Sequence, residues 1–414
     1  MPAPPLPHSV WIHAPFRSCG TYIWEEFRRR EEYTCFYEPF HEYLAGDLLQ
    51  WQKQLSEAEF NKMRHGDIAE NYFKEYPLSS NGAAVGYETL FAVPETEEGP
   101  KEFRDRLQAY LQGLIQHAGN QKAVFKCCRG ALRARWLSET FPSTVIGIIR
   151  DPRDQFQSYH SFSTGYFHAI HLLWTIYGAK HPLISPLARR LDFRAPSGFN
   201  DIHHLILTCQ YMARALPEPV LYTVFYYWWW IQWLETLPVS NMLIDTSCEM
   251  DPATLEDKIN EMNLNISVSR FYPRKYREHI MPSHEMTKIE EGVERMIARN
   301  FPDKLKIFSD HFTTKLSCLS DPVREKAKRL ISTPRETELP TPDRIPVQTT
   351  LTSNILYALY TSVQDYEKRS EKMAEVIESL NQTLDLEKAR FEKCETYAKS
   401  LERHRFFWKR KTKQ

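Results

Sequence analysis

The sequence predicts an α/β fold in which a central parallel sheet is covered by helices. Short apolar runs, bounded by turn-forming residues, alternate with segments of helical periodicity. This alternation is typical of parallel sheets that carry helices on both faces. The candidate strands lie in residues 9–15, 33–40, 122–128, 143–150 and the start of 240–264.

The candidate helices follow these strands in turn. Residues 21–30 and 130–141 are helical in pattern, and residues 101–119 carry an apolar stripe at Phe103, Leu107, Leu111, Leu114 and Ile115. An Asp-Pro pair opens another helix at residue 151, since proline and acidic residues suit a first turn. Residues 160–235 are helical and rich in Tyr, Trp and His, and a mostly helical stretch extends to residue 331.

Composition limits the classes of function. Among 414 residues, Lys plus Arg equals Asp plus Glu at 53 each, so no overall field favours nucleic acid or an acidic polymer as partner. The eight cysteines form no C-x-x-C pair and are expected to be free thiols of a reducing compartment. The first ten residues lack signal-peptide features, so we expect a cytoplasmic protein.

The most apolar segment, residues 220–234, is shorter than the ~20 residues of a membrane span. We expect a buried aromatic helix there, and a face resting on a membrane is the alternative.

The chain divides into three predicted parts. Residues 1–331 form the α/β domain, including the helical region 160–235, and the proline-rich residues 332–350 form a linker. From Leu359 onward, apolar residues alternate at four- and three-residue spacing, which predicts a coiled-coil-like arm over residues 351–414. The chain would form a homo-oligomer through residues 355–405. Alternatively, these residues would form an amphipathic helix that folds back on its own domain.

The end of this arm, "FFWKRKTK", mixes aromatic and basic groups. It is either a solvated end or a peripheral contact with anionic lipid or a partner.

The first chemical motif is "RSCGTY", which lies between the first strand and the first helix. Such a loop presents backbone N–H groups and the positive end of a helix to an anion. Gly20 allows close approach, Thr21 can hydrogen-bond an oxygen, and Arg17 supplies charge. The lysine of a Walker loop is absent, which argues against hydrolysis of a Mg-nucleoside triphosphate. The candidate anion-binding residues are Arg17, Ser18, Cys19, Gly20, Thr21 and Tyr22. A tight turn beside a core strand is the alternative.

The second motif is "RDPRDQFQSY", with Arg150 at a strand end and Ser158 in the following helix. These two side chains can converge on one phosphate. An Arg-Asp-Pro sequence that only closes the strand is the alternative interpretation.

Together the two motifs resemble the sulfotransferase superfamily that uses 3′-phosphoadenosine-5′-phosphosulfate (PAPS). The resemblance covers residues 9–265 and implies a P-loop NTPase-like three-layer fold. It implies that residues 17–22 hold the phosphosulfate, and that Arg150 and Ser158 hold the 3′-phosphate of PAPS and of its product, 3′,5′-adenosine bisphosphate (PAP). The chain departs from the family pattern at Cys19, where a small residue is usual, and at Ile244-Asp245, where Tyr-Glu is common.

A sulfuryl acceptor needs a base for its hydroxyl proton. Many cytosolic relatives use a histidine in a K-T-H run, but here Lys126 is kept and Cys128 stands at the histidine position. Carbohydrate and bacterial relatives use a glutamate after the second strand, which corresponds to Glu38. His41 is the alternative base, and a purely structural Glu38 is a further alternative. Lys126 or Arg17 would steady the leaving oxygen.

These motifs predict a PAPS-dependent sulfotransferase that acts on a hydroxyl, with a carbohydrate or glycolipid as the first choice of acceptor. The alternatives are a P-loop nucleotide or small-molecule kinase, and a non-catalytic scaffold acting through the coiled coil. No metal site is expected, because the histidines lack ligand spacing apart from the His168 and His171 pair. The remaining histidines considered are His160, His181, His203 and His204.

Overall fold

The computed structural model describes most of the first of two compact units, Met1–Thr352 and Ser353–Gln414. The described residues are 7–46, 72–93, 101–160, 165–192, 202–247, 251–268 and 280–334. Most of the predicted linker and the whole coiled-coil-like arm lie outside these ranges. The domain boundaries and the oligomer-forming role of the arm therefore stay predictions.

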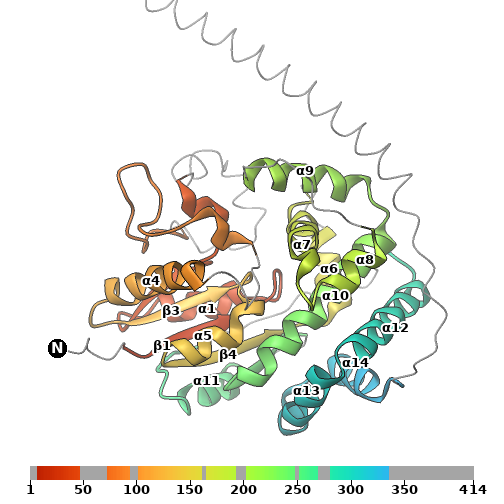
Figure 1. The fold of residues 1–414 in the computed structure, drawn as a ribbon. Helices are drawn as coiled ribbons and strands as arrows, with labels where there is room; N and C mark the ends of the chain where they lie inside the picture. The colour runs from red at the N-terminus through yellow and green to blue at the C-terminus, as the bar shows by residue number, and fades with distance from the viewer. Residues whose placement is uncertain are drawn as a thin grey trace, which may run out of the picture. The chain divides into compact units, whose positions relative to one another are not determined.

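The sheet has five parallel strands in the order β2-β3-β1-β4-β5, which confirms the predicted α/β class (Figure 1). The strands are β1 (Ser9–His13), β2 (Tyr33–Tyr37), β3 (Lys122–Cys127), β4 (Ser143–Ile149) and β5 (Met242–Asp245). Each of the five predicted apolar runs forms one of these strands.

One face of the sheet carries an aromatic ladder. Trp11 of β1 pairs in register with Phe125 of β3, and Phe125 pairs with Phe36 of β2. Their rings stack with centroid distances of 4.2 Å and 5.2 Å. Helices α4 (Lys101–His117) and α5 (Ala134–Thr140) lie over this face of the sheet.

The opposite face is covered by α1 (Gly20–Arg28). Because side chains alternate along a strand, the next register positions, Tyr37 and Lys126, point toward α1. The Trp24 ring of α1 packs edge-on against Tyr37 at 5.2 Å. Because of this alternation, the Lys126 side chain points toward the beginning of α1.

Helices α6 to α10 follow β4 and confirm the predicted helical region. They are α6 (Pro152–His160), α7 (Tyr166–Tyr177), α8 (Ser185–Arg190), α9 (Ile202–Ala215) and α10 (Glu218–Thr236). Nearly the whole of α10 is buried, with Trp228 and Trp230 almost fully enclosed, as predicted for residues 220–234. Among the residues described, no helix has the length and apolar character that crossing a bilayer requires.

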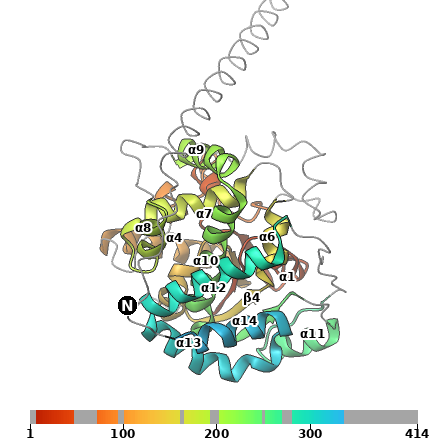
Figure 2. The same ribbon diagram turned by 90° about the vertical axis from the view of Figure 1, so that its right-hand side faces the viewer.

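The last described helices pack beside α10 (Figure 2). They follow α11 (Pro252–Asn260) and are α12 (Ser283–Asn300), α13 (Pro302–Lys315) and α14 (Asp321–Ser332). The fully buried Glu290 of α12 holds them to the domain. Its carboxylate accepts hydrogen bonds from Arg153 (2.8 Å), Lys326 (2.7 Å) and Tyr222 (2.7 Å).

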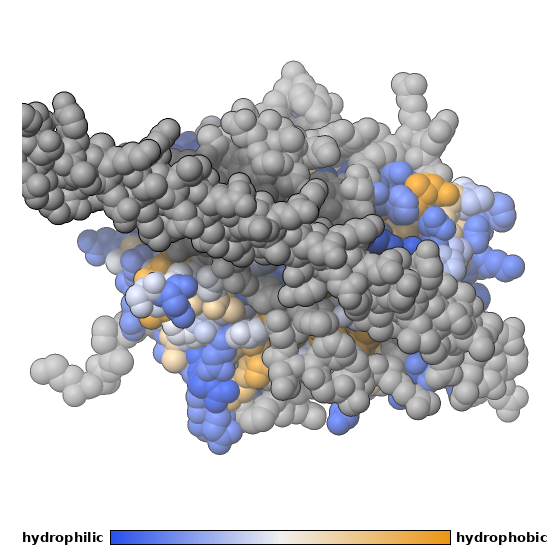
Figure 3. Space-filling view, turned by 90° about the horizontal axis from the view of Figure 1, so that it is seen from above, coloured by the Kyte–Doolittle hydropathy of each residue, from blue (hydrophilic) through white to orange (hydrophobic). Residues whose placement is uncertain are grey.

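Hydrophilic side chains dominate the described surface that is visible in Figure 3, and hydrophobic patches there are small and separate.

Candidate functional site

The candidate site lies where the strand order reverses. The central strand β1 has β3 on one side and β4 on the other. In open parallel sheets, ligands bind beyond the carboxyl ends of the strands at such a switch point. The loop of residues 14–19 leaves β1 at this position and leads directly into α1.

The loop has a compact, constrained backbone. Arg17 and Cys19 have left-handed φ values of 61° and 68°, and the Ser18 hydroxyl donates to the Pro15 carbonyl at 2.6 Å. Left-handed residues in such a loop can turn N–H groups toward an anion, but the Ser18 N–H already donates to the Pro15 carbonyl at 3.2 Å. The positive end of α1 begins at the next residue, Gly20.

Gly20 is required by close approach. A Cβ at this position would lie 2.2 Å from the Cβ of Ala14 and 3.6 Å from Cε of Lys126. Three parts of the fold therefore meet at Gly20: the beginning of α1, the end of β1 and the Lys126 side chain of β3.

The other loop side chains differ in their use. The Ser18 hydroxyl is fully buried and serves the loop itself, whereas the Thr21 hydroxyl lies 3.5 Å from the Tyr37 hydroxyl. The Tyr22 N–H donates to the Cys19 carbonyl at 3.1 Å. Burial raises the pKa of the Cys19 thiol, so this thiol is neutral beside the loop.

The two sequence motifs meet in space. Nε of Arg17 donates to Oγ of Ser158 at 3.0 Å, and Nη1 of Arg150 donates to the Arg17 carbonyl at 2.9 Å. Arg150 and Ser158 are both buried. Trp229 of α10 fixes the strand end, because its Nε1 donates to the Arg150 carbonyl at 3.0 Å. Arg17 thus contacts both residues of the second motif, and the convergence of Arg150 and Ser158 on one phosphate stays a prediction.

Two further side chains hold the loop and were missed from the sequence. Nε2 of Gln155 donates to the Phe16 carbonyl at 2.6 Å, and Oγ1 of Thr246 donates to the Ser18 carbonyl at 3.0 Å. Thr246 directly follows β5, so its position at a strand end was the available signal.

Glu38 follows β2 and lies beside this loop with its side chain buried. Its φ of 51° is rare for a non-glycine residue, and such backbone strain concentrates at functional positions. Its carboxylate accepts hydrogen bonds from Lys126 Nζ (2.6 Å), Arg129 Nη1 (3.1 Å) and the Cys128 N–H (3.1 Å). Burial acts to raise the pKa of Glu38, but Lys126 and Arg129 outweigh burial and hold that pKa below its ordinary value.

Lys126 joins the loop to the carboxylate. Its Nζ lies 3.0 Å from Sγ of Cys128 and 3.4 Å from the Tyr37 hydroxyl. Burial opposes its charge, but the neighbouring Cys128 and Glu38 raise the pKa of Lys126 well above its usual value. Lys126 therefore remains a cation between the beginning of α1 and Glu38.

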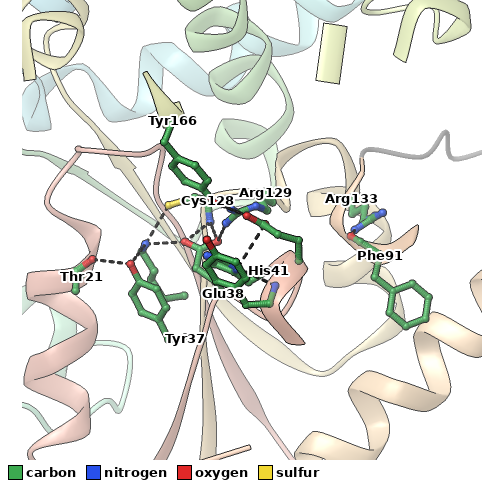
Figure 4. A network of polar contacts seen from close by, with 12 residues as sticks. Thr21, Tyr37, Glu38, His41, Phe91, Cys128, Arg129, Arg133 and Tyr166 are labelled. Atoms are coloured by element: carbon green, nitrogen blue, oxygen red, sulfur yellow. Dashed lines mark hydrogen bonds and ion pairs between the residues drawn. The ribbon is translucent and has the colours of Figure 1, made fainter. Parts of the chain in front are cut away.

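A second carboxylate, Glu42, joins the network of polar contacts around Glu38, Arg129 and Tyr166, three residues that Figure 4 labels. Nη2 of Arg129 donates to Oε2 of Glu42 at 3.0 Å and to the Tyr166 hydroxyl at 2.6 Å, and that hydroxyl donates to Oε1 of Glu42 at 2.5 Å. Burial would raise the pKa of Glu42, yet Arg129 and His41 lower it to about 2. Arg129 and Tyr166 were missed from the sequence, where Arg129 only follows a predicted strand and Tyr166 only lies within the predicted helical region 160–235.

His41 is close to this network but is neutral. Its Nδ1 accepts a hydrogen bond from the Tyr43 N–H at 3.3 Å and lies 3.4 Å from Oε2 of Glu42. Burial lowers the pKa of His41 to about 4.

A small cavity lies beneath the loop, between the strand ends and α10, and its lining includes His13, Cys128, Trp229 and Gln232. His168 and His171 are buried among aromatic rings. Within the described ranges, no group of three or more His, Cys, Asp or Glu side chains is arranged to hold a metal ion.

In comparisons with known proteins, no family model and no curated protein matches this chain. The chemistry must therefore be inferred from the geometry. The site holds four cationic side chains: Arg17 and Arg150 at the loop, and Lys126 and Arg129 on the buried, ionised carboxylate of Glu38.

Proposed function

We propose that the chain transfers a sulfuryl group from PAPS to a hydroxyl of an acceptor, with a carbohydrate or glycolipid as the acceptor class. One observation carries the proposal, namely the meeting of Arg17, Arg150 and Ser158 at the switch point of the sheet. Adjacent groups of this kind suit a donor with phosphate groups at both its 3′ and 5′ positions. A P-loop-like arrangement without the Walker lysine also fits this donor better than ATP.

The residues present fit the two ends of the donor. The loop amides and the beginning of α1 would hold the 5′-phosphosulfate, with Thr21 as a hydroxyl donor and Tyr22 in the same first turn. Arg150 and Ser158 would hold the 3′-phosphate, because a guanidinium and a hydroxyl match phosphate oxygens. Their burial favours strong, water-excluded contacts.

Chemically, the acceptor oxygen forms a bond to sulfur while the bond from sulfur to the bridging phosphate oxygen breaks. Glu38 would take the hydroxyl proton, since its carboxylate is ionised at neutral pH. Lys126, which contacts Glu38 and lies near Gly20, would stabilise the charge that develops on the leaving oxygen.

The first test is binding. Saturating PAP at ~1,000 Kd should raise the free energy of unfolding by about 4 kcal/mol, whereas ATP with Mg²⁺ should raise it far less. Stabilisation by ATP alone, with turnover, would favour the kinase alternative. Absence of any effect of PAP would refute the proposal.

The second test addresses the base. Glu38→Gln should reduce transfer by about 100-fold or more, with PAP affinity retained. Activity is measured with labelled donor against a panel of glycans, glycolipids and phenols. Wild-type turnover by Glu38→Gln would remove Glu38 as the base and make His41→Gln the next variant to test.

A further inference from the structure

The buried network beyond Glu38 reaches across the molecule to α7. Arg129 is the residue that makes this connection, because its side chain contacts four residues on three segments: the stretch after β2, the loop after β1 and the start of α7. One fork nitrogen donates to Glu38, the other donates to Glu42 and Tyr166, and the guanidinium lies 5.0 Å from the centroid of the Phe16 ring.

Each of these partners has a distinct place in the fold. Glu38 follows β2, and Glu42 begins the 3-10 helix η1 (Glu42–Ala45). Phe16 belongs to the loop after β1, and Tyr166 is the first residue of α7. A single planar guanidinium therefore links the candidate base, the anion loop and the helical region.

The charges in this network are balanced. Lys126 and Arg129 are the cations, and Glu38 and Glu42 are the anions, in the order Lys126, Glu38, Arg129, Glu42. Removing Arg129 would leave two buried carboxylates with one cation, which is strongly unfavourable.

We propose that Arg129 is a positioning residue that fixes the Glu38 carboxylate and ties it, through Glu42 and Tyr166, to the start of α7. This inference rests on the proposed function, because it assigns to Glu38 the role of base. The same arginine would then fix both the orientation of the Glu38 carboxylate and the position of the start of α7, which lies on the side assigned to the acceptor.

The fork geometry explains why arginine stands at this position. The contacts to Glu38 and to Glu42 use different nitrogens of one rigid plane, at 3.1 Å and 3.0 Å. A lysine has one point charge and cannot reproduce both directions at once.

Other titratable groups lie around the carboxylates of Glu38 and Glu42, and their charge states also affect how activity depends on pH. They are Tyr37, His41, Tyr76, Tyr87, Lys126, Cys127, Cys128 and Tyr166. Burial raises the pKa of the tyrosines and thiols and lowers the pKa of the histidine, so the tyrosines, the thiols and the histidine are all neutral near pH 7. They therefore cannot replace the positive charge that Arg129 supplies.

The test compares Arg129→Gln, Arg129→Lys and Tyr166→Phe, with PAPS as donor and the acceptor found by screening. Arg129→Gln should lower kcat by about 100-fold, with KM for PAPS within about twofold. It should also move the acidic limb of the kcat profile upward by about one pH unit or more, because Glu38 loses an opposite charge.

The conservative variants separate charge from geometry. Arg129→Lys should return the acidic limb toward its wild-type position while kcat stays about tenfold low, because the charge is restored without the fork. Tyr166→Phe should lower kcat by about tenfold or more, because it removes the hydroxyl that accepts a hydrogen bond from Arg129 and donates one to Glu42. These two variants decide the matter if Arg129→Gln fails to fold.

Arg133→Gln is the matched control. Arg133 is also a buried arginine of the same turn, but it donates to the backbone carbonyls of Phe91 and Val93. Its loss should reduce stability without moving the acidic limb.

Two failures are distinguishable. A wild-type protein that neither binds PAP nor transfers sulfate would overturn the proposed function together with this inference. An active wild type whose Arg129 variants keep the wild-type kcat and pH profile would overturn the inference alone.

Discussion

Replacing Gly20 by alanine tests the anion loop at its most crowded point. The new Cβ would lie 2.2 Å from the Cβ of Ala14, whereas carbon atoms in contact lie ~3.5–4.0 Å apart. Both atoms are attached directly to the backbone, so no change of rotamer relieves the overlap. The beginning of α1 must therefore move away from β1 by about 1–2 Å.

The size of the effect follows from what holds the loop. Gln155 and Thr246 anchor its carbonyl groups, so movement at Gly20 strains both anchors or breaks them. Overpacking of this kind costs ~1–3 kcal/mol, and we expect a loss of about 2 kcal/mol in the free energy of unfolding. A displacement of about 1 Å also moves the amide donors off an anion, and we expect PAP affinity to fall by about 100-fold.

The assay pairs denaturant unfolding with calorimetric titration of PAP. Gly113→Ala is the matched control, because Gly113 is exposed in α4 and a Cβ there meets no atom within 4 Å. That substitution should stabilise the protein by about 0.5–1 kcal/mol and leave PAP affinity unchanged. If Gly20→Ala bound PAP as tightly as the wild type, the loop would not be the anion site, whatever the change in stability.

Three further predictions concern the clamp, the C-terminal helices and the thiols. Arg150→Ala should weaken PAP binding by about tenfold or more and Ser158→Ala by about fivefold, measured by calorimetry; equal affinities would contradict the clamp. Glu290→Gln should cost about 3–5 kcal/mol of unfolding free energy at pH 7. Burial acts to raise the pKa of Glu290, but its cationic partners lower it to about 2. Its contribution is therefore present above its unfolded pKa of about 4.3 and is lost as pH falls toward 2, so a pH-independent loss would contradict this origin. Cys128, which is buried with a raised pKa, should react with a thiol reagent only as fast as the protein unfolds, and rapid labelling would show that it is accessible.

The sheet and its helices were predictable because each strand is a short apolar run with a turn signal at its end. The aromatic segment of α10 was also predictable, since it is too short for a bilayer and apolar on all sides. Spacing at strand ends also indicated Gly20 and the proximity of the second motif to the first, which Arg17 makes through Ser158 and Arg150. In a parallel sheet, all these ends meet at one edge.

The partners of Glu38 were less predictable, because side-chain pairs distant in sequence leave no periodic signal. Glu42 and Tyr166 are 124 positions apart, yet they share a hydrogen bond. Arg129 directly follows Cys128 at the end of β3, a place where arginine is common for many reasons. Only the fold shows that its two fork nitrogens reach different carboxylates.

Arg153 is a motif residue whose contacts could not be predicted from the sequence. It belongs to the motif that resembles a donor site, but its guanidinium contacts Glu290 and Ser283 of α12. Part of that motif therefore serves to attach the C-terminal helices, whereas Arg150 serves the loop. A motif identified as one unit in the sequence divides between two tasks in the structure.

The ionisation of Glu38 depends on a balance that constrains its proposed role. Burial alone would favour the protonated acid, which cannot accept a proton from a hydroxyl. Lys126 and Arg129 reverse this preference and keep the carboxylate charged, at the cost of lower basicity. A base of this kind stays ionised well below neutral pH. The ordinary glutamate pKa is about 4.3, and the pKa of Glu38 is lower still, so kcat should not fall with decreasing pH anywhere between about pH 8 and pH 6. The two cations thus keep the buried carboxylate charged, as its proposed role as a base requires, and Arg129 is the one of them that also contacts Tyr166 of α7.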